Sequence, residues 1–212
     1  MTNSFSCEPI LHDDAIEVIK QPEEKVGLEL LLNANVSEKV TGFGFEKPNT
    51  GETNDWLTPY RMLQRLGTFD LDPCGCGGMP WQTAATTYFL PEHDGLIDPW
   101  FGRVWCNPPY GPNVGDWARR MAGHGNGIML IFLRTDTTTW QKDILPFADA
   151  ALLLDGRVHF YRPSGERGES GTAPSALLAY GKNNVEALCN AGIAGALFPK
   201  AEMVSGIKAS QF

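Results

Sequence analysis

The segment at residues 105–111, Trp-Cys-Asn-Pro-Pro-Tyr-Gly, has the residue types of a binding loop for an amino group. Pro108 and Pro109 fix two φ angles and remove two backbone donors, and Pro108 restricts Asn107 to extended geometry. A strand must stop here, which leaves a rigid loop with an amide side chain, free carbonyls and an aromatic ring. The Asn107 side-chain oxygen and the Pro108 carbonyl could each accept one N–H of an exocyclic amine such as adenine N6, while Tyr110 stacks on the ring. The alternative is a rigid turn in which Asn107 only caps and Tyr110 only packs.

A second candidate site is the segment Phe-Asp-Leu-Asp-Pro-Cys-Gly at residues 69–75. A strand that ends in an acid and a small-residue turn lets a cofactor approach the backbone closely. The segment is not G-x-G-x-x-G and the sequence contains no P-loop, so nicotinamide and nucleoside-triphosphate cofactors are not indicated. A purely structural turn is the alternative.

The five cysteines are odd in number and scattered, which argues against a disulfide framework. Cys74 and Cys76 are one residue apart, which is not the usual zinc spacing, although Cys106 or His93 could in principle join them. We expect small, partly buried thiols and no metal.

The elements that must position these segments alternate between strands and helices. Thr58-Pro59 is a helix start, Gly67 is a helix end, and further helices are predicted over 114–121 and 138–145. Strands are predicted over 68–71, 103–106, 127–133, 150–154 and 176–180. The pattern predicts an α/β, doubly wound and mostly parallel sheet, with an antiparallel hairpin at its far edge because the last strands lie close together in the sequence.

The chain of 212 residues divides by composition into an acidic, partly helical N-terminal extension over 1–53 and a main domain over 54–212. The net charge is −8, but it belongs mostly to the extension, since residues from Trp56 onward are near neutral. Charge therefore neither supports nor excludes DNA as a partner. No apolar run approaches the roughly 20 residues that span a bilayer, and no secretory signal is recognisable. We expect a cytoplasmic protein that does not bind membranes.

Basic residues are frequent in a stretch rich in Gly, Pro and Ser. Arg157, Arg162 and Arg167 lie there with Tyr161, in what the composition predicts to be a loop. A solvated loop is one interpretation, and the other is a DNA-contacting loop with arginines on phosphates and Tyr161 near a base. Arg119 and Arg120, which lie earlier in the chain on a predicted helix, are expected to form a solvated helix face. No G-x-S-x-G is present, so a hydrolase is not indicated.

Taken together, residues 54–182 resemble the phage-type DNA N6-adenine methyltransferase (Dam) family, over roughly 60% of the chain. The resemblance rests on several motifs in order: Leu-Thr-Pro at 57–59, Phe-Asp-Leu-Asp-Pro-Cys at 69–74, Asp-Gly-Leu at 94–96, Trp-Cys-Asn-Pro-Pro-Tyr-Gly at 105–111, Trp117, Thr-Asp-Thr-Thr-Thr-Trp at 135–140, Gly-Arg-Val-His-Phe at 156–160 and Ala-Pro-Ser-Ala at 173–176.

The resemblance implies a Rossmann-like methyltransferase fold, S-adenosylmethionine as the cofactor and double-stranded DNA as the partner. It places against the cofactor Thr58, Pro59, Asp72, Pro73, Cys74, Gly75 and Asp94, and makes Asn107, Pro108, Pro109 and Tyr110 the catalytic loop. The expected reaction is direct methyl transfer to a flipped-out adenine, in the host cytoplasm if the chain is phage-encoded; a role in restriction-modification is open. The alternatives are transfer to an RNA adenine or a protein glutamine, and a catalytically inactive DNA-binding module on the same fold.

Overall fold

A computed structural model describes residues 56–89, 92–171 and 173–200, all within one compact unit that covers Thr53–Phe212. The predicted acidic extension over 1–53 lies outside the described residues, so its boundary and its helices stay a prediction. None of the helices in the described part of the chain is long and apolar enough to cross a membrane.

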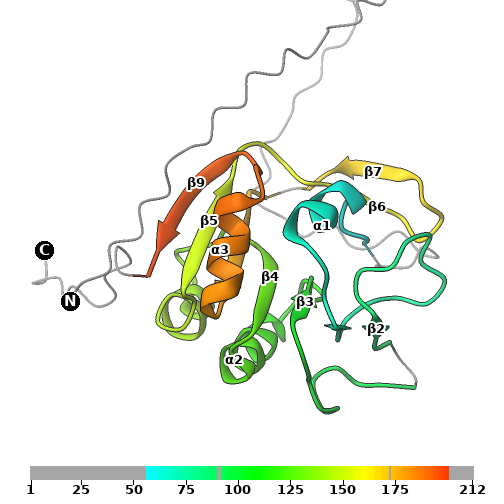
Figure 1. Ribbon diagram of the computed structural model, residues 1–212, viewed down its shortest axis with the longest axis horizontal. Helices are drawn as coiled ribbons and strands as arrows, with labels where there is room; N and C mark the ends of the chain where they lie inside the picture. The colour runs from blue at the N-terminus through cyan, green and yellow to red at the C-terminus, as the bar shows by residue number, and fades with distance from the viewer. Residues whose placement is uncertain (1–55, 90–91, 172, 201–212) are drawn as a thin grey trace, which may run out of the picture. The chain divides into compact units, whose positions relative to one another are not determined.

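A seven-stranded sheet forms the centre of this unit, in the order β2-β1-β3-β4-β8-β5-β9 (Figure 1). The strands are β1 (Leu71–Asp72), β2 (Thr86–Thr87), β3 (Val104–Cys106), β4 (Gly127–Phe132), β5 (Ala150–Leu154), β8 (Ser175–Tyr180) and β9 (Gly195–Pro199). The first four strands of this order are mutually parallel, whereas β8 runs antiparallel to both β4 and β5, and β9 runs antiparallel to β5. The predicted α/β, mostly parallel sheet is confirmed. The antiparallel pairs lie toward the edge where an antiparallel hairpin was predicted, with β8 between β4 and β5 and β9 at the edge itself.

Helices cover both faces of the sheet. Helices α1 (Tyr60–Leu66) and α3 (Lys182–Asn190) lie in front of the sheet in Figure 1, and they share one apolar cluster with Ile128 and Leu130 of β4. Helix α2 (Val114–His124) and the π-helical turn η1 (Trp140–Ile144) share the other cluster with Met129 and Ile131. The side chains of β4 thus alternate between two covered faces, which explains its continuous apolar sequence.

The basic stretch after β5 is the main local difference from the sequence prediction. It forms a second, two-stranded antiparallel sheet of β6 (His159–Tyr161) and β7 (Arg167–Ser170) rather than a loop. The backbone of Tyr161 also exchanges two hydrogen bonds with Leu57, of 2.8 and 2.9 Å. The hairpin is therefore anchored to the segment that leads into α1. Gly and polar residues are frequent in this stretch, and the register between its strands is irregular. The sequence therefore lacks the alternation of apolar and polar residues that indicates a strand.

Candidate active site

The loop at 107–110 leaves the sheet beside the turn that follows β1. Strand β3 is fully buried and pairs in parallel with both β1 and β4. Its carboxyl end, where Asn107 begins, therefore lies at the same edge as the carboxyl end of β1, where Asp72 ends. In open α/β sheets this edge is where ligands bind.

A pocket of about 530 Å³, counted with its open mouth, occupies this edge. It brings together the two candidate segments at residues 69–75 and 105–111, which are about 30 residues apart in the sequence. From the predicted catalytic loop it is lined by Asn107, Pro108, Pro109 and Tyr110, and from the predicted cofactor set by Thr58, Asp72, Cys74 and Gly75; Trp56, Leu57, Cys76, Met79, Thr83 and Trp105 complete the wall.

The orientation of the Asn107 amide is fixed by two hydrogen bonds. Its Nδ2 donates to the Trp56 carbonyl at 3.1 Å, and its Oδ1 accepts from the Tyr110 hydroxyl at 3.3 Å. A carbonyl oxygen has two lone pairs, so Oδ1 keeps acceptor capacity for one more N–H. The amide donor is thus held by the protein, and the acceptor is the end that a ligand can use.

Tyr110 is packed on one side. Its ring stacks on Phe132 with centroids 3.8 Å apart and meets the edge of Phe160 at 6.3 Å. Burial raises the pKa of the Tyr110 hydroxyl well above its ordinary value, so this group stays a donor to Asn107. In the structure, Tyr110 therefore packs on Phe132 and supports Asn107 through its hydroxyl. Stacking on a base requires the other face of its ring.

Asp72 is the buried acid of the pocket, with a side chain held by two neighbours. Its Oδ1 accepts the Cys74 backbone N–H at 3.1 Å, and its Oδ2 accepts the hydroxyl of Thr83. Burial raises the pKa of Asp72 from 3.8 to about 6 against the lowering effect of these bonds. At neutral pH this carboxylate carries a poorly solvated charge, which would be relieved by a cation or a hydroxyl donor.

Two thiols meet on the inner side of the pocket. The sulfur atoms of Cys74 and Cys106 are 3.6 Å apart, and both cysteines are free. Burial, reinforced by the contact with Cys106, raises the pKa of Cys74 well above its ordinary value, so this thiol stays neutral. Among the described residues, no group of three or more His, Cys, Asp or Glu side chains is arranged to hold a metal ion.

The other predicted cofactor residues lie around this pocket rather than in its wall. Pro73 is buried in the turn after β1, and its carbonyl oxygen would lie only 1.7 Å from a Cβ at Gly95. Asp94 therefore belongs to a loop that packs directly on that turn. Pro59, by contrast, lines a different hollow.

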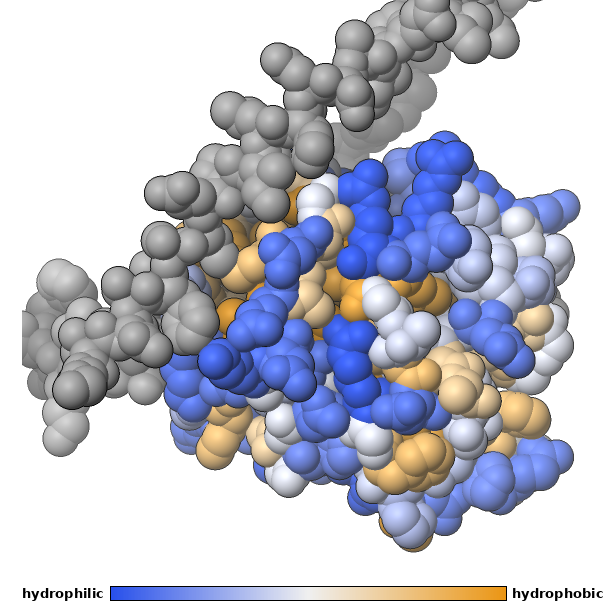
Figure 2. Space-filling model, in the orientation of Figure 1, coloured by the Kyte–Doolittle hydropathy of each residue, from blue (hydrophilic) through white to orange (hydrophobic). Residues whose placement is uncertain are grey.

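That second hollow, of about 700 Å³ with its open mouth, collects most of the predicted DNA-binding residues. Arg157, Tyr161 and Arg167 line it, whereas the Arg162 guanidinium lies over the Trp56 ring, 5.5 Å from its centroid. Figure 2 shows that hydrophilic residues predominate over the end of the molecule that carries β6 and β7, with small hydrophobic patches between them.

Three residues near these sites were not singled out correctly by sequence reasoning. Trp56 and Thr83 hold Asn107 and Asp72 in place, and neither belongs to a spacing pattern. Arg120 was predicted to be solvated, but its guanidinium donates to the carbonyls of the loop that carries Asp94. Arg119 is exposed, as predicted, and pairs with Asp116 and Asp143.

Comparison with family models matches residues 47–188 to DNA N-6-adenine-methyltransferase (Dam). Comparison with curated proteins and with solved structures gives no match. The matched range contains the whole pocket, the loop of Asp94 and the β6–β7 hairpin, and it covers well over half of the chain. The chain therefore belongs to the DNA N-6-adenine-methyltransferase (Dam) family.

Proposed function

We propose that this protein transfers a methyl group from S-adenosylmethionine to the N6 amine of adenine in double-stranded DNA. The observation that carries the proposal is the single pocket in which Asn107 and the two prolines face Thr58, Asp72, Cys74 and Gly75. A methyl transferase needs its donor and acceptor in one site with the reacting atoms aligned. Family membership identifies the acceptor class as adenine in DNA.

The chemistry of the pocket fits the cofactor. The Thr58 hydroxyl is buried and has no partner within the described structure, so it is a donor that a bound group can satisfy. Gly75 also lines the pocket; a Cβ there would lie 2.2 Å from the methyl group of Thr87, so packing against β2 requires a glycine and leaves backbone in the pocket wall. We infer that Thr58, Asp72, Cys74 and Gly75 hold the cofactor, with Pro59, Pro73 and Asp94 supporting or extending the site. When bound, S-adenosylmethionine supplies an electrophilic methyl group on a positively charged sulfur.

In this proposal the catalytic loop acts on the amine through acceptors. Asn107 Oδ1 and the Pro108 carbonyl each accept one N–H, which leaves the nitrogen lone pair directed at the methyl group. Positive charge develops on the nitrogen during transfer, and fixed acceptors stabilise it without reorganising. The hydrogen bond from Asn107 to Trp56 keeps the acceptor oriented before the base arrives. Such a reaction requires no metal ion and no covalent enzyme intermediate.

Adenine N6 is inaccessible to such a pocket inside a duplex, so the proposal includes extrusion of the base. The extruded ring would use the face of Tyr110 that Phe132 does not cover. Arg157, Tyr161, Arg162 and Arg167 are the proposed DNA contacts. Tyr161, Arg162 and Arg167 belong to the β6–β7 hairpin, which is anchored to the edge of the pocket through Leu57, and Arg157 lies two residues before β6. Arginine is the side chain that best matches phosphate geometry.

If these arginines contact phosphates, the affinity for DNA should depend on salt concentration in a specific way. Arg157→Ala and Arg167→Ala should each weaken DNA binding about equally for all sequences and reduce the slope of log affinity against log salt by about one. S-adenosylmethionine binding should not change. Fluorescence titrations at several salt concentrations measure this, with Lys182→Ala, an exposed lysine that pairs with Glu186, as the control. An unchanged slope in both variants would remove Arg157 and Arg167 from the DNA interface.

The proposed activity is tested with purified protein, S-adenosylmethionine labelled in its methyl group, and separate acceptors. Duplex DNA should become labelled, and the product after digestion should be N6-methyladenine. Labelling of RNA or of protein glutamine instead would replace DNA as the substrate. Binding of DNA without cofactor binding would indicate an inactive module on a methyltransferase fold.

A further inference from the structure

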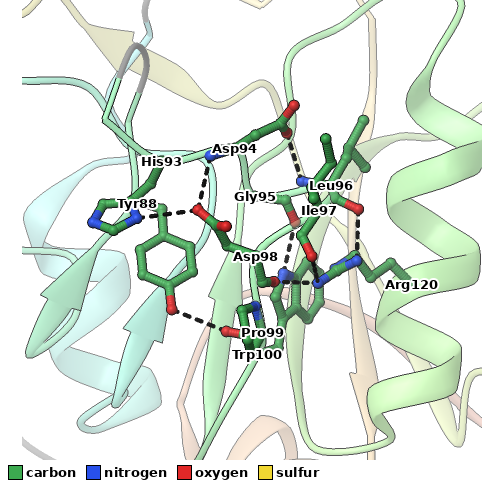
Figure 3. Close-up of polar contacts among 10 residues, drawn as sticks. All are labelled: Tyr88, His93, Asp94, Gly95, Leu96, Ile97, Asp98, Pro99, Trp100 and Arg120. Carbon is green, nitrogen blue, oxygen red and sulfur yellow. Dashed lines mark hydrogen bonds and ion pairs between the residues drawn. The ribbon is translucent and has the colours of Figure 1, made fainter.

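Residues 93–100, between β2 and β3, form an irregular loop that carries Asp94; it is called the Asp94 loop below (Figure 3). Within it, Asp94 Oδ1 accepts the Leu96 N–H at 2.9 Å, and the Asp94 N–H donates to Asp98 Oδ2 at 3.0 Å. One carboxylate oxygen of Asp94 is therefore committed to the shape of the loop. The other is the oxygen through which Asp94 would bind the cofactor.

The Asp94 loop is already in contact with the turn that follows β1 and cannot move closer to it. Gly95 is buried against the Pro73 carbonyl, and a Cβ there would also lie 2.8 Å from the Trp117 ring. A displacement of this loop would therefore move Asp94 relative to Asp72 and Cys74. The loop must be held from its other side.

Arg120 of α2 supplies that hold (Figure 3). Its guanidinium donates to the carbonyls of Leu96 at 2.6 Å, Ile97 at 3.3 Å and Asp98. It also lies over the Trp100 ring at 5.3 Å. Irregular backbone needs partners for its carbonyls, and the rigid fork of a guanidinium can satisfy several at once, which a single ammonium cannot do in the same geometry.

Trp100 extends this contact to the residue next to Asp94. Its ring stacks near Trp117 of α2 at 6.3 Å, and its Nε1 donates to the Gly95 carbonyl at 2.8 Å. Helix α2 begins at Val114, four residues after Tyr110. The same helix therefore follows the catalytic loop and holds the Asp94 loop.

We propose that Arg120 is a positioning residue for the cofactor: it sets the Asp94 loop against the turn after β1 and couples that loop to the helix that follows the catalytic loop. This inference rests on the proposed function, because it assumes that the ligand of the pocket is S-adenosylmethionine. It assigns a role to a residue that touches neither substrate.

The test compares cofactor affinity in Arg120→Met, Arg120→Lys and Arg119→Met with that of the unaltered chain, by calorimetry with S-adenosylmethionine well below the unfolding temperature. Arg120→Met should raise Kd at least about tenfold, since a small displacement of a binding group has effects of this order or larger. Arg120→Lys should restore part of the affinity. Arg119→Met, which loses the pairs of the exposed Arg119 side chain with Asp116 and with the partly buried Asp143, should bind like the unaltered chain.

Two further readouts separate positioning from a general structural role. Arg120→Met should raise the KM for the cofactor and leave the KM for DNA unchanged. In an Asp94→Ala background it should raise Kd less than twofold further, because both changes act through one contact. Should Arg120→Met fail to fold, Trp100→Phe keeps an aromatic ring at this position, removes the donor to the Gly95 carbonyl and should still raise Kd several-fold.

The outcomes are distinguishable from failure of the proposed function. If the unaltered chain does not bind S-adenosylmethionine, the proposed function is wrong. If it binds and the Arg120 and Trp100 variants bind within twofold of it, the positioning role is wrong. Independent, multiplicative effects of Arg120→Met and Asp94→Ala would also contradict it.

Discussion

Replacing Asn107 with alanine should reduce methyl transfer to DNA at least about 10³-fold and leave S-adenosylmethionine binding within about twofold. The substitution removes the acceptor that aims the amine, but none of the residues proposed to hold the cofactor. The Tyr110 hydroxyl loses its partner at 3.3 Å, while its ring keeps the stack on Phe132, so the loop should stay folded. Single-turnover rates with duplex DNA and calorimetric titration with the cofactor measure the two effects separately.

Two companion variants sharpen this prediction. Asn107→Asp keeps an acceptor oxygen but loses the donor to the Trp56 carbonyl, so its rate should fall between those of the unaltered chain and the alanine variant. Asn190→Ala, at an exposed asparagine that ends α3, should behave like the unaltered chain. Retained transfer in Asn107→Ala would remove Asn107 from the chemistry.

Replacing Asp72 with asparagine should stabilise the protein and weaken cofactor binding at the same time. Burial raises the pKa of Asp72 from 3.8 to about 6, so the folded state disfavours the charged form. Well below pH 3.8 the carboxyl is protonated in both states, and burial of the charge costs nothing. The cost grows as pH rises from about 4 to about 6, and it is complete above that range.

The gain in unfolding free energy expected for Asp72→Asn therefore increases with pH. A shift of this size corresponds to about 3 kcal/mol at pH 8 and to about 1 kcal/mol at pH 4.5, and Asp72→Asn should recover up to these amounts. Affinity for S-adenosylmethionine should fall at least about tenfold, because a neutral amide satisfies a cationic or hydroxyl donor less well than a carboxylate. Urea unfolding at the two pH values and calorimetry measure both effects.

A matched control is available two residues earlier. Asp70 is exposed and accepts the Arg103 backbone N–H at 2.6 Å. Asp70→Asn should leave cofactor affinity unchanged and should not stabilise the protein. At a functional site, the substitution is expected to raise stability and lower cofactor affinity. If Asp72→Asn instead destabilised the protein at pH 8 and bound the cofactor normally, Asp72 would be a structural residue.

The elements that the sequence predicted well are those whose pattern is local. The apolar run of β4, the short run of β5 and the Thr58-Pro59 start of α1 each coincide with the structure to within a few residues. The strand predicted at 68–71 begins only at Leu71, because sheet pairing with β2 and β3 starts there. The predicted helix over 138–145 is a π-helical turn at Trp140–Ile144.

The features that escaped prediction depend on distant contacts. The sequence pattern did not indicate α3 or β9, and it could not place β8 between β4 and β5, since β8 joins strands that precede it by more than 20 residues. Arg120 has the spacing of an exposed helical residue, and its role exists only because the loop at 96–98 packs beside it. Within the site, the chemical types of Asn107 and Asp72 were readable, whereas their supports, Trp56 and Thr83, come from elsewhere in the chain.

The most direct test of the proposed activity is sequencing of DNA from cells that lack their own adenine methylation and express this protein, with a method that detects N6-methyladenine. We predict N6-methyladenine at one recurring sequence context with the unaltered chain and none with Asn107→Ala. Folded protein that binds S-adenosylmethionine but leaves adenine unmodified, or equal modification with both proteins, would contradict it.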